Sequence, residues 1–265
     1  MASGFSGAGV YRVDAAAGAF VLKIAGEPLV SWRLEILVQA ARAGVAPRLV
    51  HVDEARGAIV SELVEDRSFA AFYMRDRDAA LELLGHTLQR VHVLPIPPGA
   101  RPADPDAFLA PFESSLPALA TAALARVREE RVVSETRVLS HNDLNPTNLV
   151  FDGKGVLLLD WNTAAPNDPL YDLATIAVFM RMDDAACARL CTAYGLAEVP
   201  ARLPALRRRV AALCGAIFLR LSGLHEGDES IRLVDVYQQL RTGALNIATP
   251  QGRWAFGVAL VNESQ

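Results

Sequence analysis

The most informative stretch of the sequence reads LSHNDLNPTNLVFDGKGVLLLDWNTAAPNDPLYDLA and runs from Leu139 to Ala174. Inside it, His141, Asp143 and Asn148 have the spacing H-x-D-x-x-x-x-N, and Asp160 follows at the end of an apolar run. The spacing alone would be weak evidence for a functional site. Its context is more specific, because a predicted hairpin ends in Asp160 and D-P-L-Y-D-L-A then opens a helix.

These residue types suit phosphoryl transfer from ATP. That chemistry needs a carboxylate beside the acceptor hydroxyl and two oxygen-bearing side chains that hold Mg²⁺ against the phosphates. Asp143 and Asn148, on one loop, can supply the base and one metal ligand, and the hairpin brings Asp160 back beside them as the second ligand. Magnesium prefers oxygen donors and keeps several waters, so one Asp and one Asn are sufficient.

The residues before this segment predict a small antiparallel sheet with one helix. In the expected helix, Leu29–Ala43, apolar residues recur at helical intervals. Gly44 suits the C-terminal cap of this helix, and Pro47 prevents the helix from continuing. The expected strands are Val10–Val13, Phe20–Ile24, Arg48–Val52 and Ala58–Leu63, and the expected helix is Leu29–Ala43. We assign residues 1–64 to a nucleotide-binding N-lobe, with a hinge near Leu63 to Arg67.

The remaining residues, 65–265, predict a mostly helical C-lobe that carries the catalytic loop and the acceptor site. Pro95–Pro105 is rich in proline and is expected to be a loop. A hairpin is expected from Leu149–Phe151 and Val156–Asp160. Helices are expected at Arg77–Val93, Asp106–Arg131 with an interruption near Pro117, around Leu173–Met180, Ala201–Leu224 and Ile231–Ile247. The fold class is therefore α+β.

The overall composition excludes several classes of protein. The 265 residues are 52% hydrophobic and 21% charged, which is typical of a globular protein, and the net charge of −4 argues against binding to duplex nucleic acid. No apolar run reaches the roughly 18 residues that cross a bilayer, and the N-terminus lacks the features of a signal peptide. The three cysteines lack metal-ligand partners at useful spacing, so we expect a reduced, cytoplasmic protein.

Three stretches, HNDLNPTNLVFD, LLLDWNTA and NDPLYDLA, resemble a known group. They are similar to the catalytic core of the aminoglycoside phosphotransferase and choline/ethanolamine kinase superfamily, and especially to its bacterial choline/ethanolamine and thiamine kinase branch. The resemblance extends less specifically across nearly the whole chain. It implies the two-lobed protein-kinase-like fold, ATP and Mg²⁺ as cofactors, and a small-molecule acceptor.

The resemblance also implies roles for single residues. Asp143 would be the catalytic base, Asn148 and Asp160 the magnesium ligands, and His141 a structural support of the catalytic loop. Asp172 would be a buried organiser of the loop, and its local sequence also suits the N-cap of its helix.

The N-lobe is expected to hold the nucleotide. Lys23 is a lone cation in an apolar strand, where a lysine is costly unless it is paired, and Glu35 on the following helix is a plausible partner. In kinases such a pair positions the α- and β-phosphates. A lysine whose ammonium group reaches water, and a glutamate on a solvated helix face, are the alternatives. By position, the carbonyl of Ser61 and the amide of Leu63 would bind adenine at the hinge.

Two features depart from the family's pattern. Gly4–Gly9 would be the glycine-rich loop over the phosphates, but the family usually has a full strand before this loop and often an Asn within it, where Ala8 stands here. The sequence leaves open whether these differences affect the order of the loop and the affinity for ATP. Asn162 stands where relatives commonly carry an acidic residue, which would alter the acceptor pocket or a contact behind it.

The sequence says least about the acceptor. We expect a small hydroxyl-bearing metabolite such as choline, ethanolamine or thiamine, and a cationic acceptor would need carboxylates or aromatic rings around it. Two alternatives stay open: phosphorylation of aminoglycosides or other antibiotics, and a non-catalytic nucleotide-binding module. The candidate acceptor residues, each explained as well by a surface charge or a core aromatic, are Trp161, Asp183, Asp184, Glu226, Asp228, Tyr237 and Trp254.

Overall fold

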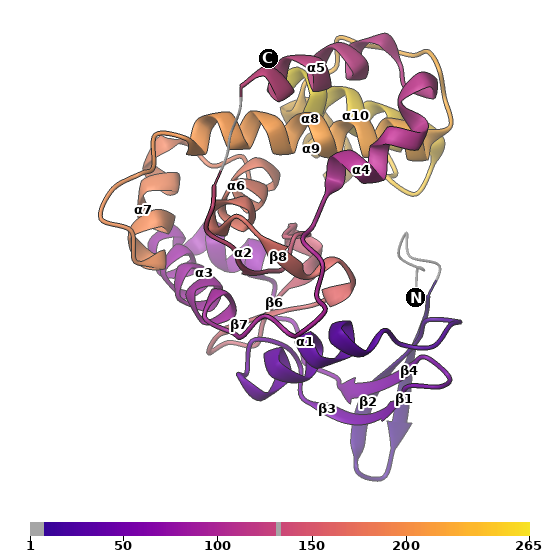
Figure 1. The fold of residues 1–265 in the computed structure, drawn as a ribbon, viewed down its shortest axis with the longest axis vertical. Coiled ribbons are helices and arrows are strands. Elements are labelled where there is room, and N and C mark those ends of the chain that lie inside the picture. The colour runs from indigo at the N-terminus through magenta and orange to yellow at the C-terminus, as the bar shows by residue number, and fades with distance from the viewer. Residues whose placement is uncertain (1–7, 131–133) are drawn as a thin grey trace. The chain divides into compact units, whose positions relative to one another are not determined.

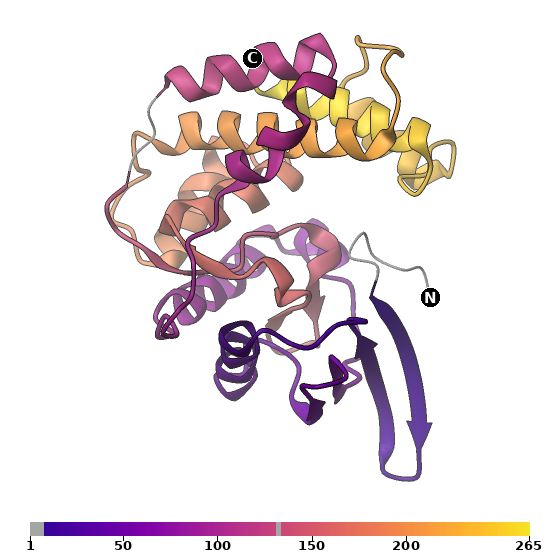
Figure 2. The same cartoon turned by 45° about the vertical axis from the view of Figure 1, so that its right-hand side comes forward.

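The N-terminal part of the chain forms a four-stranded antiparallel sheet and one helix (Figure 1). The computed structural model describes residues 8–130 and 134–265. The strand order is β1-β2-β4-β3, and Figure 2 shows β1 and β2 as a long hairpin. The elements are β1 (Gly9–Ala15), β2 (Gly18–Ile24), α1 (Ser31–Arg42), β3 (Leu49–Asp53) and β4 (Ala58–Glu62). The predicted elements of this region are confirmed to within two residues at each end.

Helix α1 ends where glycine was expected to end it. Gly44 has a φ of 66°, in the left-handed region that glycine adopts without a steric penalty. The next residue, Val45, donates its N–H to the carbonyl of Ala40 and accepts the N–H of Leu158 at 2.8 Å. The end of the helix is therefore tied to the hairpin in the catalytic segment.

The catalytic segment folds into two short antiparallel strand pairs. The predicted hairpin is confirmed: its turn is closed by Asp152, whose Oδ1 accepts the N–H groups of Lys154 and Gly155 at 2.8 Å each. The second pair, β5 with β8, was not predicted, because three-residue strands leave no periodic signal. The elements are β5 (Val138–Ser140), η2 (Pro146–Asn148), β6 (Leu149–Phe151), β7 (Val156–Leu158), η3 (Trp161–Thr163) and β8 (Ala165–Asn167).

The linker after β4 is fastened to this hairpin. Oδ1 of Asp66 accepts the N–H of Ser68 at 2.8 Å and that of Phe151 at 3.1 Å, and the N–H of Arg67 donates to the carbonyl of Phe151 at 2.8 Å. Phe72 then stacks on Phe151, with ring centroids 4.3 Å apart and an interplanar angle of 8°. The linker therefore extends the edge of strand β6.

Four helices accompany the sheet and the catalytic segment: α2 (Phe69–Arg75), α3 (Arg77–His92), α6 (Pro169–Phe179) and α7 (Asp184–Tyr194). Apart from Pro169, every residue of α6 is buried, which is why it reads as an apolar stripe in the sequence. Gly85 lets α3 approach α7 closely, since a Cβ there would lie 2.5 Å from that of Ala193. Helix α2 was not predicted, whereas α3 matches its expected range and no helix interrupts the proline-rich stretch up to Asp104.

A second group of helices has its own apolar core. It comprises α4 (Pro105–Leu109), η1 (Ala110–Ser115), α5 (Ala118–Glu129), α8 (Leu203–Ser222), α9 (Leu233–Thr242) and α10 (Pro250–Glu263). Gly215 and Gly257 allow α8 and α10 to pack tightly, because a Cβ on either would come within 2.9 Å of the other's carbonyl oxygen. The helix predicted to reach Ile247 ends at Thr242, where Gly243 takes a φ of 73°, and α10 was not predicted.

The chain divides into two units, residues 1–103 with 136–199 and residues 104–135 with 200–265. The sheet and the catalytic segment thus belong to the same unit. The division at residue 64 into nucleotide-binding and acceptor-binding lobes stays a prediction. Among the residues that the structure describes, no helix is both long and apolar enough to span a membrane.

Candidate active site

The carboxylate of Asp143 is held on both oxygens by amide side chains. Asn145 Nδ2 donates to Oδ1 at 3.1 Å, and Asn148 Nδ2 donates to Oδ2 at 2.9 Å and to the Asp143 carbonyl at 2.8 Å. Burial raises the pKa of Asp143 above its ordinary value, and the charge of Asp160 adds to the increase, while His141 and the two amides oppose it. The structure therefore presents an oriented carboxylate with increased basicity.

Lys23 and Asp160 form an ion pair beside this loop. Lys23 Nζ lies 2.9 Å from Oδ1 of Asp160, and the two side chains are 25% and 37% exposed. Asp160 has a φ of 57°, an uncommon left-handed conformation for a residue other than glycine. The residue before it, Leu159, donates its N–H to the carbonyl of Asn148 at 2.9 Å, so the two predicted metal ligands are joined through the backbone.

His141 braces the loop from inside. Its Nε2 donates to the carbonyl of Leu159 at 2.8 Å, and its Nδ1 accepts the N–H of Asp143 at 3.3 Å. The ring is fully buried and packs edge-on against Trp161, with centroids 5.0 Å apart. One imidazole thus connects the backbone at Asp143 to the residue preceding Asp160, which is the position that a supporting role requires.

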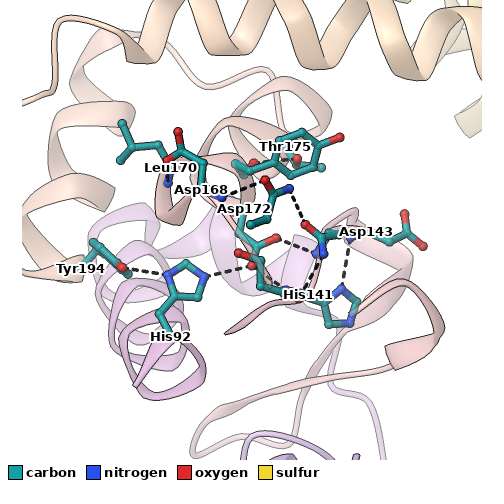
Figure 3. Close-up of polar contacts among 12 residues, drawn as sticks. His92, His141, Asp143, Asp168, Leu170, Asp172, Thr175 and Tyr194 are labelled. Atoms are coloured by element: carbon teal, nitrogen blue, oxygen red, sulfur yellow. Dashed lines mark hydrogen bonds and ion pairs between the residues drawn. The ribbon is translucent and has the colours of Figure 1, made fainter. Parts of the chain in front are cut away.

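Asp172 anchors the same loop from helix α6 (Figure 3). Its carboxylate, 0% exposed, accepts the N–H groups of His141 and Asn142 at 2.8 Å each. Burial alone would raise the pKa of Asp172, but its bond with His92 and the neighbouring His141 outweigh that effect and lower the pKa. The expectation that Asp172 also caps its helix is wrong: the N-cap is Asp168, whose carboxylate accepts the N–H of Leu170 at 2.9 Å.

The other predicted nucleotide-binding groups are not gathered around Lys23. Glu35 is exposed on α1 and accepts a bond from Gln39, and among the described residues no ion pair joins Glu35 to Lys23. Ser61 is paired with strands on both sides, and the Leu63 amide donates to the carbonyl of Ala19 at 3.2 Å. Their adenine contacts stay a prediction that requires backbone groups which the sheet uses in this structure.

The structure describes part of the glycine-rich loop and the whole segment around Asn162, the two places where the sequence departs from the family's pattern. Of the glycine-rich loop, residues 4–7 lie outside the described residues, while Ala8 is buried and Gly9 begins β1. Asn162 is exposed, and its carbonyl accepts a bond from Arg33 of α1 at 3.0 Å, so the segment after Asp160 is linked to that helix.

Several candidate acceptor residues have structural roles. Trp161 and Trp254 are buried, with 6% and 4% exposure. Asp183 caps α7 and pairs with Arg77, and Asp228 accepts two bonds from Ser230. The Trp161 indole N–H donates to the carbonyl of Leu158 at 2.9 Å, so Trp161, Asp183 and Asp228 each have a structural partner.

Sequence reasoning missed four residues that shape the site: Asn142, Asn145, His92 and Tyr194. Asn142 has a φ of 66°, and its side chain donates to the carbonyls of Thr163 and Ala165. The H-x-D-x-x-x-x-N spacing contains both asparagines but gives them no role. No role in the site was predicted for His92, although a histidine on an apolar helix face could have indicated a buried polar partner.

The donors present fit a magnesium ion. Because Asn148 uses its NH₂ group on Asp143, its Oδ1 is the atom left to act as a ligand. The carboxylate of Asp160 adds oxygen donors, one of which, Oδ1, is paired with Lys23. Asn148 and Asp160 are therefore the residues that would hold the metal.

The comparisons agree on one family. Residues 1–213 match the model of the phosphotransferase enzyme family, and no curated protein matches the sequence significantly. Similar solved structures include a choline/ethanolamine kinase family protein from Mesorhizobium loti (21% identity, TM-score 0.64, 97% of this chain and 89% of that chain). Another is spectinomycin phosphotransferase in complex with ADP and spectinomycin (13% identity, TM-score 0.65, 97% of this chain and 88% of that chain). A third is a type VIII aminoglycoside-3'-phosphotransferase (25% identity, TM-score 0.59, 80% of this chain and 91% of that chain). The predicted α+β, protein-kinase-like fold is confirmed.

Proposed function

Because the chain belongs to the phosphotransferase enzyme family, we propose that it transfers the γ-phosphoryl group of ATP to a hydroxyl of a small metabolite. The observation that carries the proposal is a continuous set of contacts within one unit of the chain. Lys23 bonds to Asp160, Leu159 bonds to Asn148, and Asn148 bonds to Asp143. A cation, two metal-ligand candidates and a base are thereby held together, as phosphoryl transfer requires.

Asp143 acts as the base. The acceptor hydroxyl gives its proton to the Asp143 carboxylate while its oxygen forms the new bond to the γ-phosphorus. The bond between that phosphorus and the bridging oxygen breaks, and ADP leaves with the electron pair. Asn145 and Asn148 keep both carboxylate oxygens oriented, and burial raises the pKa of Asp143, which makes the carboxylate a better proton acceptor than an ordinary aspartate.

In this proposal the nucleotide is bound by the two metal ligands, through Mg²⁺, and by Lys23. Asn148 and Asp160 would hold Mg²⁺, which neutralises charge on the phosphates when bound. Lys23 is the residue before the last in β2 and is paired with Ile59 of β4, so its ammonium group reaches Asp160 from a fixed position in the sheet. From there Lys23 would also contact the phosphates.

For the acceptor we propose choline, ethanolamine or a thiamine-like alcohol, on the similarity of three motifs to that branch of the superfamily. The rival is an antibiotic, since the similar structures include a spectinomycin phosphotransferase as well as a choline/ethanolamine kinase family protein. A panel of choline, ethanolamine, thiamine, kanamycin and spectinomycin separates the two, with the phosphorylated product identified by ³¹P NMR.

The test of the proposed function is ADP release from Mg-ATP with that panel. We expect turnover with at least one acceptor and a decrease of roughly a hundredfold or more in Asp143→Ala. Asp14→Asn is the control, because Asp14 lies on the exposed hairpin and pairs only locally with Arg12. ATP-dependent thermal stabilisation without turnover on any acceptor, unchanged by Asp143→Asn, would instead identify a nucleotide-binding module. Full activity of Asp143→Ala would remove Asp143 from the mechanism.

A further inference from the structure

A chain of polar groups leads from the half-buried Tyr194 of α7, through the buried His92 and Asp172, to the loop that carries Asp143 (Figure 3). Oη of Tyr194 lies 2.7 Å from Nδ1 of His92, and Nε2 of His92 lies 3.0 Å from Oδ2 of Asp172. Asp172 in turn accepts the two backbone N–H groups that immediately precede Asp143. The chain of contacts therefore ends on the backbone of the proposed base.

The burial of this chain makes each contact important. The His92 and Asp172 side chains are 2% and 0% exposed, so water cannot replace a lost partner. Oδ2 of Asp172 is shared by His92 and the amide of His141, while Oδ1 holds the amide of Asn142. Without His92, one oxygen of a buried charge would keep a single neutral donor, and the carboxylate would be held less firmly.

Tyr194 is placed where its hydroxyl could fix which nitrogen of His92 carries the proton. Burial raises the pKa of Tyr194 to about 12, and the charges of Asp172 and Asp168 add to the increase, so the phenol stays protonated. The Tyr194 O–H can then donate to Nδ1 of His92, which leaves the proton of the neutral ring on Nε2, facing Asp172. A phenylalanine at residue 194 would keep the ring contact but lose this control.

The packing of α3 against α7 sets the distance between the two side chains. His92 is the last residue of α3 and Tyr194 the last residue of α7. At Gly85, a Cβ would lie 2.5 Å from the Cβ of Ala193 and 2.8 Å from the backbone nitrogen of Tyr194. The close approach of the helices thus brings Tyr194 within reach of His92.

We propose that His92 and Tyr194 are positioning residues of the catalytic loop, acting through Asp172 on the backbone that carries Asp143. Their effect on the rate rests on the proposed function. Their stabilising effect on the loop does not rest on the proposed function, because hydrogen exchange of the amides of residues 141 and 142 measures it directly.

The test compares Tyr194→Phe, His92→Leu and His92→Gln with a control. Thr87→Val is the matched control: Thr87 is also buried on α3, and its hydroxyl contacts the carbonyls of Leu83 at 2.9 Å and Val156 at 3.4 Å rather than Asp172. Two quantities are measured below the melting temperature of each variant: kcat and KM for ATP, and hydrogen–deuterium exchange of residues 139–145 by mass spectrometry.

We expect Tyr194→Phe and His92→Leu to lower kcat roughly tenfold or more, with little change in KM for ATP, since misplacement of a catalytic group affects mainly the chemical step. Exchange of residues 139–145 should rise several-fold in the same variants. His92→Gln should recover part of both, because its Nε2 can still donate to Asp172. Thr87→Val should leave both unchanged.

Normal exchange of residues 139–145 in Tyr194→Phe and His92→Leu would overturn the proposal. So would an equal increase in Thr87→Val, which would indicate general loosening of α3. If His92→Leu does not fold, Tyr194→Phe decides, as it removes a single oxygen atom. If the wild type has no turnover with any acceptor, the proposed function fails, and the exchange measurement still decides the positioning role.

Discussion

Replacing Asp172 with asparagine should destabilise the protein by an amount that follows from its contacts. The carboxylate accepts three N–H groups, two on Oδ2 and one on Oδ1, at 0% exposure. Asparagine has one oxygen and one NH₂ group, so in either orientation a backbone N–H of the loop faces another donor. A buried unsatisfied amide costs about 1–3 kcal/mol, and the remaining bonds lose their charge assistance, which gives a total of roughly 2–4 kcal/mol.

The effect of Asp172→Asn should depend on pH with a definite sign. The pKa of Asp172 is lowered in the folded protein, although burial opposes this, because His92 and His141 stabilise the charged form. Its contribution to stability is therefore present above the unfolded-state pKa and is lost as pH falls through the folded-state pKa. The difference between wild type and variant should be full at neutral pH and shrink in acid.

Urea unfolding at neutral and acid pH measures this difference, with Asp235→Asn as the control. Asp235 also pairs with a cation, Arg232, but on the surface, so its replacement should change stability little. A neutral-pH loss for Asp172→Asn no larger than that of Asp235→Asn would refute the reasoning, as would a difference that grows on acidification.

Three further predictions concern the same unit. Asp143→Asn should lower turnover roughly a hundredfold or more and remove a pH dependence of stability. Burial raises the pKa of Asp143, so wild-type stability should rise as pH falls through that raised pKa, whereas calorimetry of Asp143→Asn should show no such rise. Asn145→Ala should lower kcat without a matching rise in KM for ATP, whereas equal kcat would show that Asn148 alone orients the base. Gly85→Ala should cost about 1–3 kcal/mol through overpacking against α7, measured by urea unfolding, and an unchanged midpoint would contradict the close approach.

The sequence predicted the N-terminal sheet and the catalytic hairpin well because local signals agree there. Gly44 ends α1, and the Asp152–Gly155 turn closes the hairpin, and both depend on neighbours only a few residues away. The short pair β5–β8 lacks such signals, whereas the start of α10 carries one that was overlooked: Thr249 caps the helix and Pro250 is its first residue. The strands are too short for a periodic pattern, and they form because residues far apart in the chain are brought together.

The site was predictable in its residue types but less so in its partners. The spacing of Asp143, Asn148 and Asp160 is visible in one stretch of sequence. The partner of Lys23 was not: it pairs with Asp160, 137 residues away, rather than with Glu35 on the neighbouring helix. Similarly, the role of His92 follows from its contact with Asp172. That contact could not be predicted, because a contact between two helices distant in sequence leaves no local pattern.

The fastening of the linker to strand β6 limits how the sheet can move. Asp66 and Arg67 hold the backbone of Phe151 by two bonds, and Phe72 covers the same residue. Within the linker, a swivel of the sheet would have to bend the chain between Leu63, whose amide bonds to Ala19 of β2, and Asp66. Strand β6, which follows Asn148 directly, would stay with the helices during such a motion, whereas Lys23 would travel with the sheet. The distance between Lys23 and Asp160 would then report how far the sheet has turned.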